Sequence, residues 1–256
     1  MSAKELFAEP DLPRRTILGV PVVALPWIEA IETMRAMIAG QRFALITWLN
    51  AHNANLAHEN TDFRQALGQF LILPDGLGVD IASRLLHGEP FPANLNGTDF
   101  IPGLLVMETS PLRVGLIGAR PEVVAKATAS FRQLAPQHEF RVISDGFFRA
   151  GDEPRILEIL KNYHPHILLV AMGVPRQEMF MARNLTAEHC TLAFGVGALF
   201  DFRAGVVPRA PLILQRLRFE WLYRLAQEPA RLWRRYIVGN PLFLLRVMRE
   251  KFRGTK

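Results

Sequence analysis

Short apolar runs alternate with longer amphipathic segments along most of the chain. Six runs have the length and composition of buried strands, at residues 43–49, 70–73, 112–117, 140–144, 167–172 and 192–196. Helical periodicity falls between them, at residues 79–86, 100–108, 122–134 and 153–163. Strand, helix and strand at this spacing predict an α/β fold: a Rossmann-like parallel sheet flanked by helices and joined by right-handed crossovers.

The N-terminal part adds smaller elements to this pattern. Residues 16–23 predict a short strand or hairpin, and a helix is expected at 26–39, with Pro26 in its first turn and Gly40 at its end. Another helix should begin directly after the strand at 43–49. In Gly97-Thr98-Asp99, the side chain of Asp99 is expected to cap the helix at 100–108.

The pattern changes after residue 208. Three helices are expected, at 211–227, 229–238 and 241–253, each opened by a proline. From 209 to 256 there are twelve Lys or Arg and three acidic residues, a balance of +9, so the first 208 residues sum to −3. We therefore divide the chain into an α/β domain at 1–208, which allows two subregions meeting near residue 110, and a basic helical appendage at 209–256.

This appendage mixes arginine, tryptophan and apolar residues at helical spacing, which is typical of helices that lie in the interface of an anionic membrane without crossing it. Two other interpretations stay open. A basic, aromatic segment could bind nucleic acid, although its apolar content is heavy for that role and no reading module is recognisable. It could also be a helical cap packed on the core, with the arginine stems covering apolar surface.

Length and composition set the broad class. The 256 residues are half hydrophobic, which suits a folded α/β protein. No apolar run reaches the roughly 18 to 20 residues that span a bilayer, and residues 1–15 lack a signal-peptide pattern, so we expect a cytoplasmic protein. The single Cys190 is expected to be a buried thiol and offers no thiolate metal cluster.

One carboxylate occupies a position where α/β proteins often bind ligands. Asp75 follows the buried strand at 70–73 and precedes Gly76, where a helix should open. Pro-Asp-Gly is also an ordinary turn sequence, so its position alone does not establish a role. Asn50 and His52 follow the strand at 43–49, and they should share a crevice with Asp75 if the two strands are neighbours. A lone histidine such as His52 is more often a solvated or helix-capping residue.

Three further strands end in glycine-containing loops, which include Gly118, Gly173 and Gly197. Small residues there let backbone N–H groups approach a phosphate, so a nucleotide diphosphate is a candidate ligand, although glycine also simply ends strands. No dinucleotide fingerprint, Walker A sequence or Asp-x-Asp metal motif is found. Asp201 is a second candidate carboxylate, for which we favour a capping role.

The motifs together resemble the WecG/TagA/CpsF family of bacterial glycosyltransferases. They run in family order: Asn50-Ala51-His52, Leu73-Pro74-Asp75-Gly76-Leu77-Gly78-Val79, Asn96-Gly97-Thr98-Asp99, Gly173-Val174-Pro175-Arg176-Gln177-Glu178, Gly195-Val196-Gly197-Ala198-Leu199-Phe200-Asp201, Arg209-Ala210-Pro211, Glu220-Trp221-Leu222-Tyr223-Arg224-Leu225 and Glu228-Pro229-Ala230-Arg231. Their order from about residue 16 to 240 makes chance similarity a poor explanation.

The resemblance implies an inverting, metal-independent enzyme that needs no cofactor. Such an enzyme moves a hexose or N-acetylhexosamine from a UDP-sugar to a polyprenyl-diphosphate-linked saccharide. It works in exopolysaccharide or cell-surface polysaccharide biosynthesis, bound peripherally to the inner face of the bacterial inner membrane. Its partners would be these substrates and an anionic membrane surface. Nucleic acid is not expected as a partner, and a homo-oligomer is allowed.

The same resemblance assigns roles to residues. Asp75 falls on the family's proposed general base, and Asn50 and Gln177 fall on substrate contacts. With the loop positions, the expected substrate-binding residues are Asn50, Gly76, Asn96, Asp99, Gly118, Gly173, Gln177, Glu178 and Gly197. The arginines implied to hold the lipid-linked diphosphate and the membrane are Arg209, Arg216, Arg224 and Arg231.

The chain departs from the family pattern at two positions. Many members have Thr two residues before the Asn that corresponds to Asn50, where this chain has Trp48 with Thr47 beside it; many also have Arg where it has Asn94. Because both positions lie where sugars should bind, the donor sugar stays open. A non-catalytic binder of a nucleotide-sugar or lipid-linked saccharide is the leading alternative, and a nucleotide-dependent oxidoreductase is a weaker one.

Overall fold

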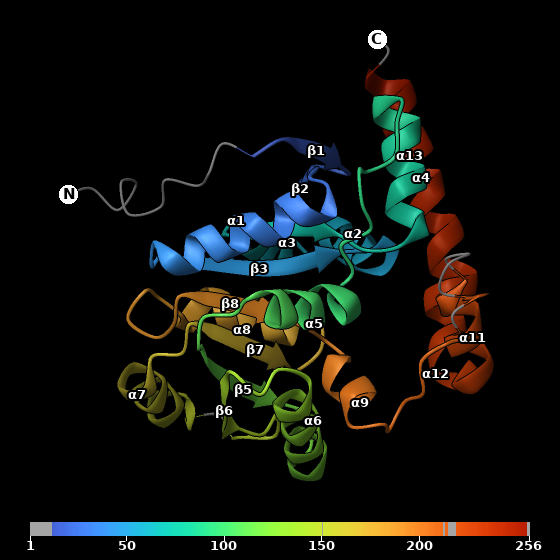
Figure 1. Ribbon diagram of the computed structural model, residues 1–256. Coiled ribbons are helices and arrows are strands. Elements are labelled where there is room, and N and C mark those ends of the chain that lie inside the picture. The colour runs from blue at the N-terminus through green and yellow to red at the C-terminus, as the bar shows by residue number, and fades with distance from the viewer. Residues whose placement is uncertain (1–11, 150, 212, 215–218, 255–256) are drawn as a thin grey trace.

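Six parallel strands form the centre of the protein in the computed structural model (Figure 1), which describes residues 12–149, 151–211, 213–214 and 219–254. They lie in the order β4-β3-β8-β7-β5-β6. Their bounds are Ala44–Leu49 (β3), Phe70–Pro74 (β4), Arg113–Gly118 (β5), Glu139–Ser144 (β6), Ile167–Ala171 (β7) and Leu192–Gly195 (β8). The predicted α/β fold with a parallel sheet is therefore confirmed, each strand within two residues of its expected bounds.

Helices cover both faces of this sheet. One core contains residues from α1 (Trp27–Ala39), α5 (Gly97–Met107), α6 (Pro121–Leu134) and α9 (Leu199–Arg203). The other contains residues from α2 (Ala51–Glu59), α3 (Thr61–Leu67), α4 (Leu77–His87), α7 (Glu153–Tyr163) and α8 (Arg176–Asn184). Neighbouring residues on one strand divide between the two cores, as Leu168 and Leu169 do, because successive side chains point to opposite faces.

The connections after the two central strands leave in opposite directions. The chain passes from β3 to α2 on one face, and from β8, the neighbour of β3, to α9 on the other. A crevice opens outside the carboxyl ends of parallel strands where the connections diverge in this way. The candidate site lies at this edge of the sheet.

A separate antiparallel hairpin precedes the sheet, as the pattern at 16–23 predicted. Its strands are β1 (Arg14–Ile17) and β2 (Val20–Val23). Leu18 and Gly19 between them both have positive φ, 50° and 77°, which matches the right-handed twist of a two-residue hairpin turn.

The C-terminal helices differ from the prediction. After α11 (Glu220–Gln227), the chain forms α12 (Pro229–Trp233), a π-helical turn η1 (Arg234–Val238) and α13 (Gly239–Gly254) without a break in helical backbone. The expected separate helices at 229–238 and 241–253 are therefore one. Pro241 therefore lies inside a helix, shortly after its π-helical turn, which is an irregular point of the hydrogen-bond ladder. Residues 212 and 215–218 of the helix expected at 211–227 lie outside the described part of the chain.

This continuous helix is partly integrated into the core. Helix α13 contacts α2 and α4, and its Phe243 and Val247 are fully buried. The interpretation as a cap packed on the core therefore applies to that face of α13 (Figure 1). In the residues described, we find no helix with the length and apolarity needed to cross a membrane.

Candidate active site

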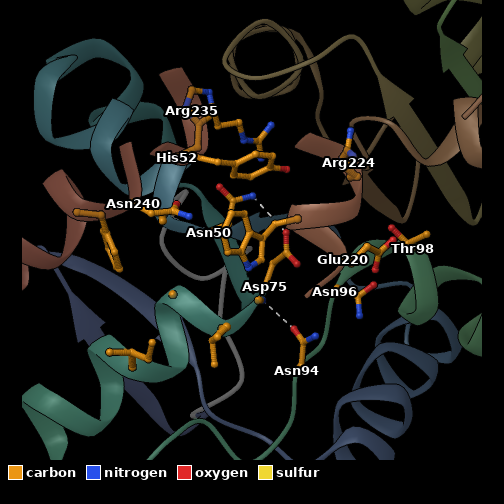
Figure 2. A pocket seen from close by; sticks show the side chains of 18 of the residues that line it. Asn50, His52, Asp75, Asn94, Asn96, Thr98, Glu220, Arg224, Arg235 and Asn240 are labelled. Atoms are coloured by element: carbon orange, nitrogen blue, oxygen red, sulfur yellow. Dashed lines mark hydrogen bonds between the residues drawn. The ribbon is translucent and has the colours of Figure 1, made fainter. Parts of the chain in front are cut away.

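A cavity of about 370 Å³ lies at the carboxyl ends of β3 and β4 and beneath the C-terminal helices (Figure 2). Its volume is in the range of small-molecule sites. Its lining residues come mainly from the ends of these strands, the loop before α5 and the segment from α11 to α13. The lining residues are Asn50, Ala51, His52, Asp75, Gly76, Leu77, Gly78, Ile81, Asn94, Asn96, Thr98, Asp99, Phe202, Glu220, Trp221, Arg224, Arg235, Tyr236, Asn240, Phe243 and Leu244.

Asp75 stands at the base of this cavity. Its backbone N–H donates to the carbonyl of Leu49 (2.9 Å), which extends the pairing of β3 and β4 by one residue. Gly76 follows with φ of 91°, a conformation that glycine adopts without strain, and the chain turns there into α4. Asp75 is partly exposed as a residue and lines the cavity, so it is not sealed in the interior.

Asn50 holds this carboxylate from the neighbouring strand. Its Nδ2 donates to Oδ2 of Asp75 (3.2 Å), and its Oδ1 accepts from the N–H of Asn53 as the N-cap of α2. One side chain therefore orients Asp75 and starts a helix. The expectation that the ends of β3 and β4 share a crevice is confirmed.

The electrostatics of Asp75 combine opposing effects. Burial raises the pKa of its carboxyl above the ordinary value, while the Asn50 hydrogen bond and the charges of Arg235 and Arg224 act to lower it. The net direction is upward. A carboxylate with a raised pKa is a stronger base than an exposed aspartate.

The C-terminal helices supply a cationic wall opposite Asp75. Arg224 from α11 lies over the ring of Phe202, and Arg235 comes from η1. The Nε atoms of both arginines are buried and lack a hydrogen-bond partner among the described residues. Burial lowers the pKa of Arg235. Donors in this state suit an anion that enters the cavity.

His52 lies beside this wall (Figure 2). Burial, and then the charge of Arg235, lowers its pKa to about 4. The imidazole is therefore neutral near pH 7 and adds no charge to the cavity.

Arg209 connects two sides of the cavity rim. Its guanidinium bonds Asp99 of α5 (2.6 Å) and pairs with Glu220 of α11 (3.7 Å). Burial raises the pKa of Glu220, although the charge of Arg209 opposes that rise. Arg209 itself does not line the cavity. The contact fastens the beginning of α11 to the domain that carries Asp75.

The expected capping role of Asp99 is wrong. Asn96 is the N-cap of α5 and accepts from the N–H of Asp99 (3.1 Å), and its Nδ2 donates back to Asp99 Oδ2 (3.0 Å). Asp99 occupies the third helical position, as in a capping box.

The expected capping role of Asp201 is also wrong, because Asp201 lies within α9 and Ala198 is the N-cap residue there.

Gln177 and Glu178 lie beneath the site and do not line the cavity. Glu178 Oε1 accepts from Thr47 Oγ1 and from Gln177 Nε2, both at 2.8 Å, and Gln177 Oε1 accepts from the N–H of Gly197 (3.1 Å). Both side chains are buried. Burial raises the pKa of Glu178. The geometry gives these residues a role in fixing the loop between β8 and α9.

The other predicted site residues fall outside the cavity. Gly118 ends β5 with φ of 126°, and a Cβ there would lie 2.2 Å from the carbonyl oxygen of Ala171, so the fold itself requires glycine. Gly173 and Gly197 also have positive φ and do not line the cavity. Arg231 is exposed and pairs with Glu228 (2.6 Å). Arg216 lies outside the described residues.

The two departures from the family pattern have different surroundings. Trp48 is buried, and its Nε1 donates to the carbonyl of Leu95 beneath the loop that carries Asn94 and Asn96. Asn94 lines the cavity and accepts from the N–H of Gly76 (2.9 Å). Trp48 therefore supports the loop, whereas Asn94 faces the site.

Several cavity residues had no assigned role in the sequence. Arg235, Trp221, Tyr236 and Asn240 come from the basic helices, and the available signal was only the regular mixture of arginine and aromatic residues. In the part of the chain that the structure covers, no group of three His, Cys, Asp or Glu is placed to share a metal ion.

Comparison with known proteins gives matches over nearly the whole chain. A family model described as "Glycosyl transferase WecG/TagA/CpsF family" matches residues 15–256. A protein of Bacillus spizizenii is 32% identical over 186 residues, which cover 72% of this chain and 70% of that protein. A protein of Bacillus subtilis is 29% identical over 239 residues, covering 92% and 91%. Both relatives are named N-acetylglucosaminyldiphosphoundecaprenol N-acetyl-beta-D-mannosaminyltransferase.

Proposed function

The chain belongs to the WecG/TagA/CpsF family of glycosyltransferases, and from this premise we propose that it transfers a hexose or N-acetylhexosamine from a UDP-sugar to a polyprenyl-diphosphate-linked saccharide. The relatives' names, which describe transfer of N-acetylmannosamine to an undecaprenyl-diphosphate-linked sugar, support this substrate class. The single observation that carries the proposal is that Asp75 lines a cavity with two arginines on the opposite wall.

Asp75 is the proposed general base. The acceptor hydroxyl attacks the anomeric carbon on the face opposite UDP and loses its proton to Asp75. A new C–O bond forms as the bond to the diphosphate oxygen breaks, and UDP leaves with the electron pair. A single displacement of this kind inverts the anomeric configuration. Asn50 positions the carboxylate through its 3.2 Å hydrogen bond.

Arg224 and Arg235 are proposed to stabilise the leaving diphosphate. Their buried Nε donors lack partners among the described residues, and both arginines line the cavity that contains Asp75. Preorganised cations around a developing negative charge can replace a metal ion in this role. Metal-independent transfer is the proposal that follows.

The basic appendage at 209–256 is proposed to bring the enzyme to an anionic membrane surface on the cytoplasmic side. Large apolar side chains are exposed along it beside the arginines. They are Ile213, Phe219, Leu222, Trp233, Ile237, Val238, Leu245 and Phe252. Helices with exposed apolar and basic residues bind the headgroup region of a membrane peripherally. The substrate-bearing lipid would then reach the cavity from that surface.

The proposal is tested by incubating the purified protein in excess chelator with a panel of UDP-sugars and polyprenyl-diphosphate saccharides. We expect UDP release only when a matching acceptor is present, a product one sugar heavier by mass spectrometry, and the inverted anomer by NMR. UDP-sugar binding without any product would support the binder instead. Activity that returns only with Mg²⁺ or Mn²⁺ would contradict the metal-independent mechanism.

A further inference from the structure

A second cavity, of about 570 Å³, lies on the side of α13 that faces the β1–β2 hairpin. The hairpin turn, the end of α2, helix α3 and most of the length of α13 form its walls. Its lining residues are Leu18, Gly19, His58, Arg64, Leu242, Arg246, Arg249, Glu250 and Arg253. None of these residues lines the cavity that contains Asp75.

Two of its arginines are held rigidly by the fold. Arg64 donates to the carbonyl of Leu18 (2.7 Å). Arg246 donates to Oδ1 of Asn55 (2.9 Å) and to Oε1 of Glu59 (2.7 Å). These contacts fix the positive charges in the cavity wall before any ligand arrives.

The other two arginines are uncommitted. Arg249 and Arg253 lie one turn apart on α13, are exposed, and have no hydrogen bond or ion pair with other described residues. The acid in the lining, Glu250, accepts from the N–H of Leu18 (3.0 Å). Four guanidinium groups against the carboxylates of Glu250 and of Glu59, which pairs with Arg246, leave a net positive cavity.

The lining also contains His58. Burial, and then the charges of Arg246 and Arg64, lowers the pKa of His58, while Glu59 and Glu250 oppose this shift.

An apolar ridge runs beside the arginine row. Leu245 and Phe252 lie two turns apart on α13 and are 48% and 67% exposed. At helical spacing they flank Arg249, so charged and apolar side chains share one edge of the helix. A soluble anion needs only the arginines, whereas a phospholipid offers both a phosphate and adjacent apolar chains.

We propose that this second cavity binds the phosphate of an anionic phospholipid headgroup, with Leu245 and Phe252 entering the membrane beside it. The inference deepens the proposed membrane association of the appendage and does not depend on the chemistry at Asp75. It gives the enzyme a fixed contact with the bilayer, separate from the contact with its lipid-linked substrate.

The test compares vesicle binding by two charge-matched variants. Arg249→Gln/Arg253→Gln removes the uncommitted arginines, and Lys126→Gln/Arg155→Gln removes two exposed charges from α6 and α7, which pack near β6 at the edge of the sheet away from β4 (Figure 1). Both variants lower the net charge of +6 by two. Binding is measured by sedimentation with vesicles of phosphatidylglycerol in phosphatidylcholine and with phosphatidylcholine alone, with circular dichroism as the folding control.

We expect Arg249→Gln/Arg253→Gln to bind anionic vesicles at least about tenfold more weakly, since each juxtamembrane arginine contributes about fivefold, while the α6/α7 variant stays near the wild type. Equal losses in both variants would show a general charge effect and overturn the proposal. Tight binding of free glycerol phosphate without preference for anionic vesicles would also overturn it. Transfer to an acceptor with a short, water-soluble lipid should be unchanged by Arg249→Gln/Arg253→Gln, so failure here is separable from failure of the proposed reaction.

Discussion

The Nδ2 atom of Asn50 lies 3.2 Å from Oδ2 of Asp75, which ties the ends of two neighbouring parallel strands together through their side chains. The same Asn50 caps α2 through its Oδ1. The arrangement makes the position of the proposed base depend on strand pairing and on a helix start, both of which belong to the rigid part of the fold. The base is thereby preorganised before substrates bind.

Replacing Asn50 by Ser should shift the pH dependence of the reaction. Serine retains the capping preference but is too short to repeat the amide contact with Asp75. Because the Asn50 hydrogen bond lowers the pKa of Asp75, its loss should raise that pKa and move the acidic limb of kcat/KM to higher pH. Asn60→Ser is the matched control, since Asn60 caps α3 in the same way. An unchanged acidic limb in Asn50→Ser would contradict the contact's role.

The substitution Asp75→Asn should not destabilise the protein at neutral pH. Burial raises the folded-state pKa of Asp75 above 3.8, so its favourable contribution to folding is complete below 3.8 and is lost as the pH rises through the folded pKa. The amide carries no charge and avoids that loss. The thermal midpoint of the variant should therefore meet or exceed that of the wild type, with a difference that grows from acid to neutral pH. A clearly lower midpoint at neutral pH would contradict this electrostatic account.

Arg235 and Arg234 provide a neighbouring pair with different surroundings. Arg235 lines the cavity, whereas Arg234 is exposed and stacks on Trp233. Arg235→Gln should lower kcat/KM by about 10²-fold through weaker stabilisation of the leaving diphosphate, while Arg234→Gln should stay near the wild type. Steady-state kinetics with a soluble acceptor make this comparison. Equal rates for the two variants would remove Arg235 from the mechanism.

Gln177→Met should cost stability, because methionine leaves the N–H of Gly197 without its acceptor and removes one of the two donors to Oε1 of Glu178, where Thr47 remains. A lost partner for a buried polar group costs about 1 to 3 kcal/mol in the free energy of unfolding. Urea denaturation measures it. Unchanged stability together with a higher KM for the UDP-sugar would instead favour direct substrate contact by Gln177.

The sheet and the Asp75 crevice could be predicted because both follow from local signals. Buried runs such as Phe70–Pro74 have few alternatives to a strand, and sequential strands usually pair, which placed Asn50 beside Asp75. Helix α3 was not predicted, because its seven residues at 61–67 are too short for a clear period. Capping was assigned to Asp99 in place of Asn96, since both are good caps and only the backbone decides between them.

The cationic wall could not be derived in the same way. Arg224 and Arg235 reach the cavity because α11 and η1 fold back over strands that lie about 150 residues earlier in the chain. Local sequence patterns do not show which of these distant elements pack together. The continuity of α12, η1 and α13 was missed for a local reason. Proline usually marks a helix start, and here Pro241 follows a π-helical turn inside one long helix.

The central claim is that the carboxylate of Asp75 takes the proton of the acceptor hydroxyl, and sugar transfer by Asp75→Asn tests it most directly. The variant should bind the UDP-sugar and keep the circular dichroism spectrum of the wild type, while its single-turnover rate falls by about 10²-fold or more. A folded Asp75→Asn protein that transfers sugar at nearly the wild-type rate would contradict the account.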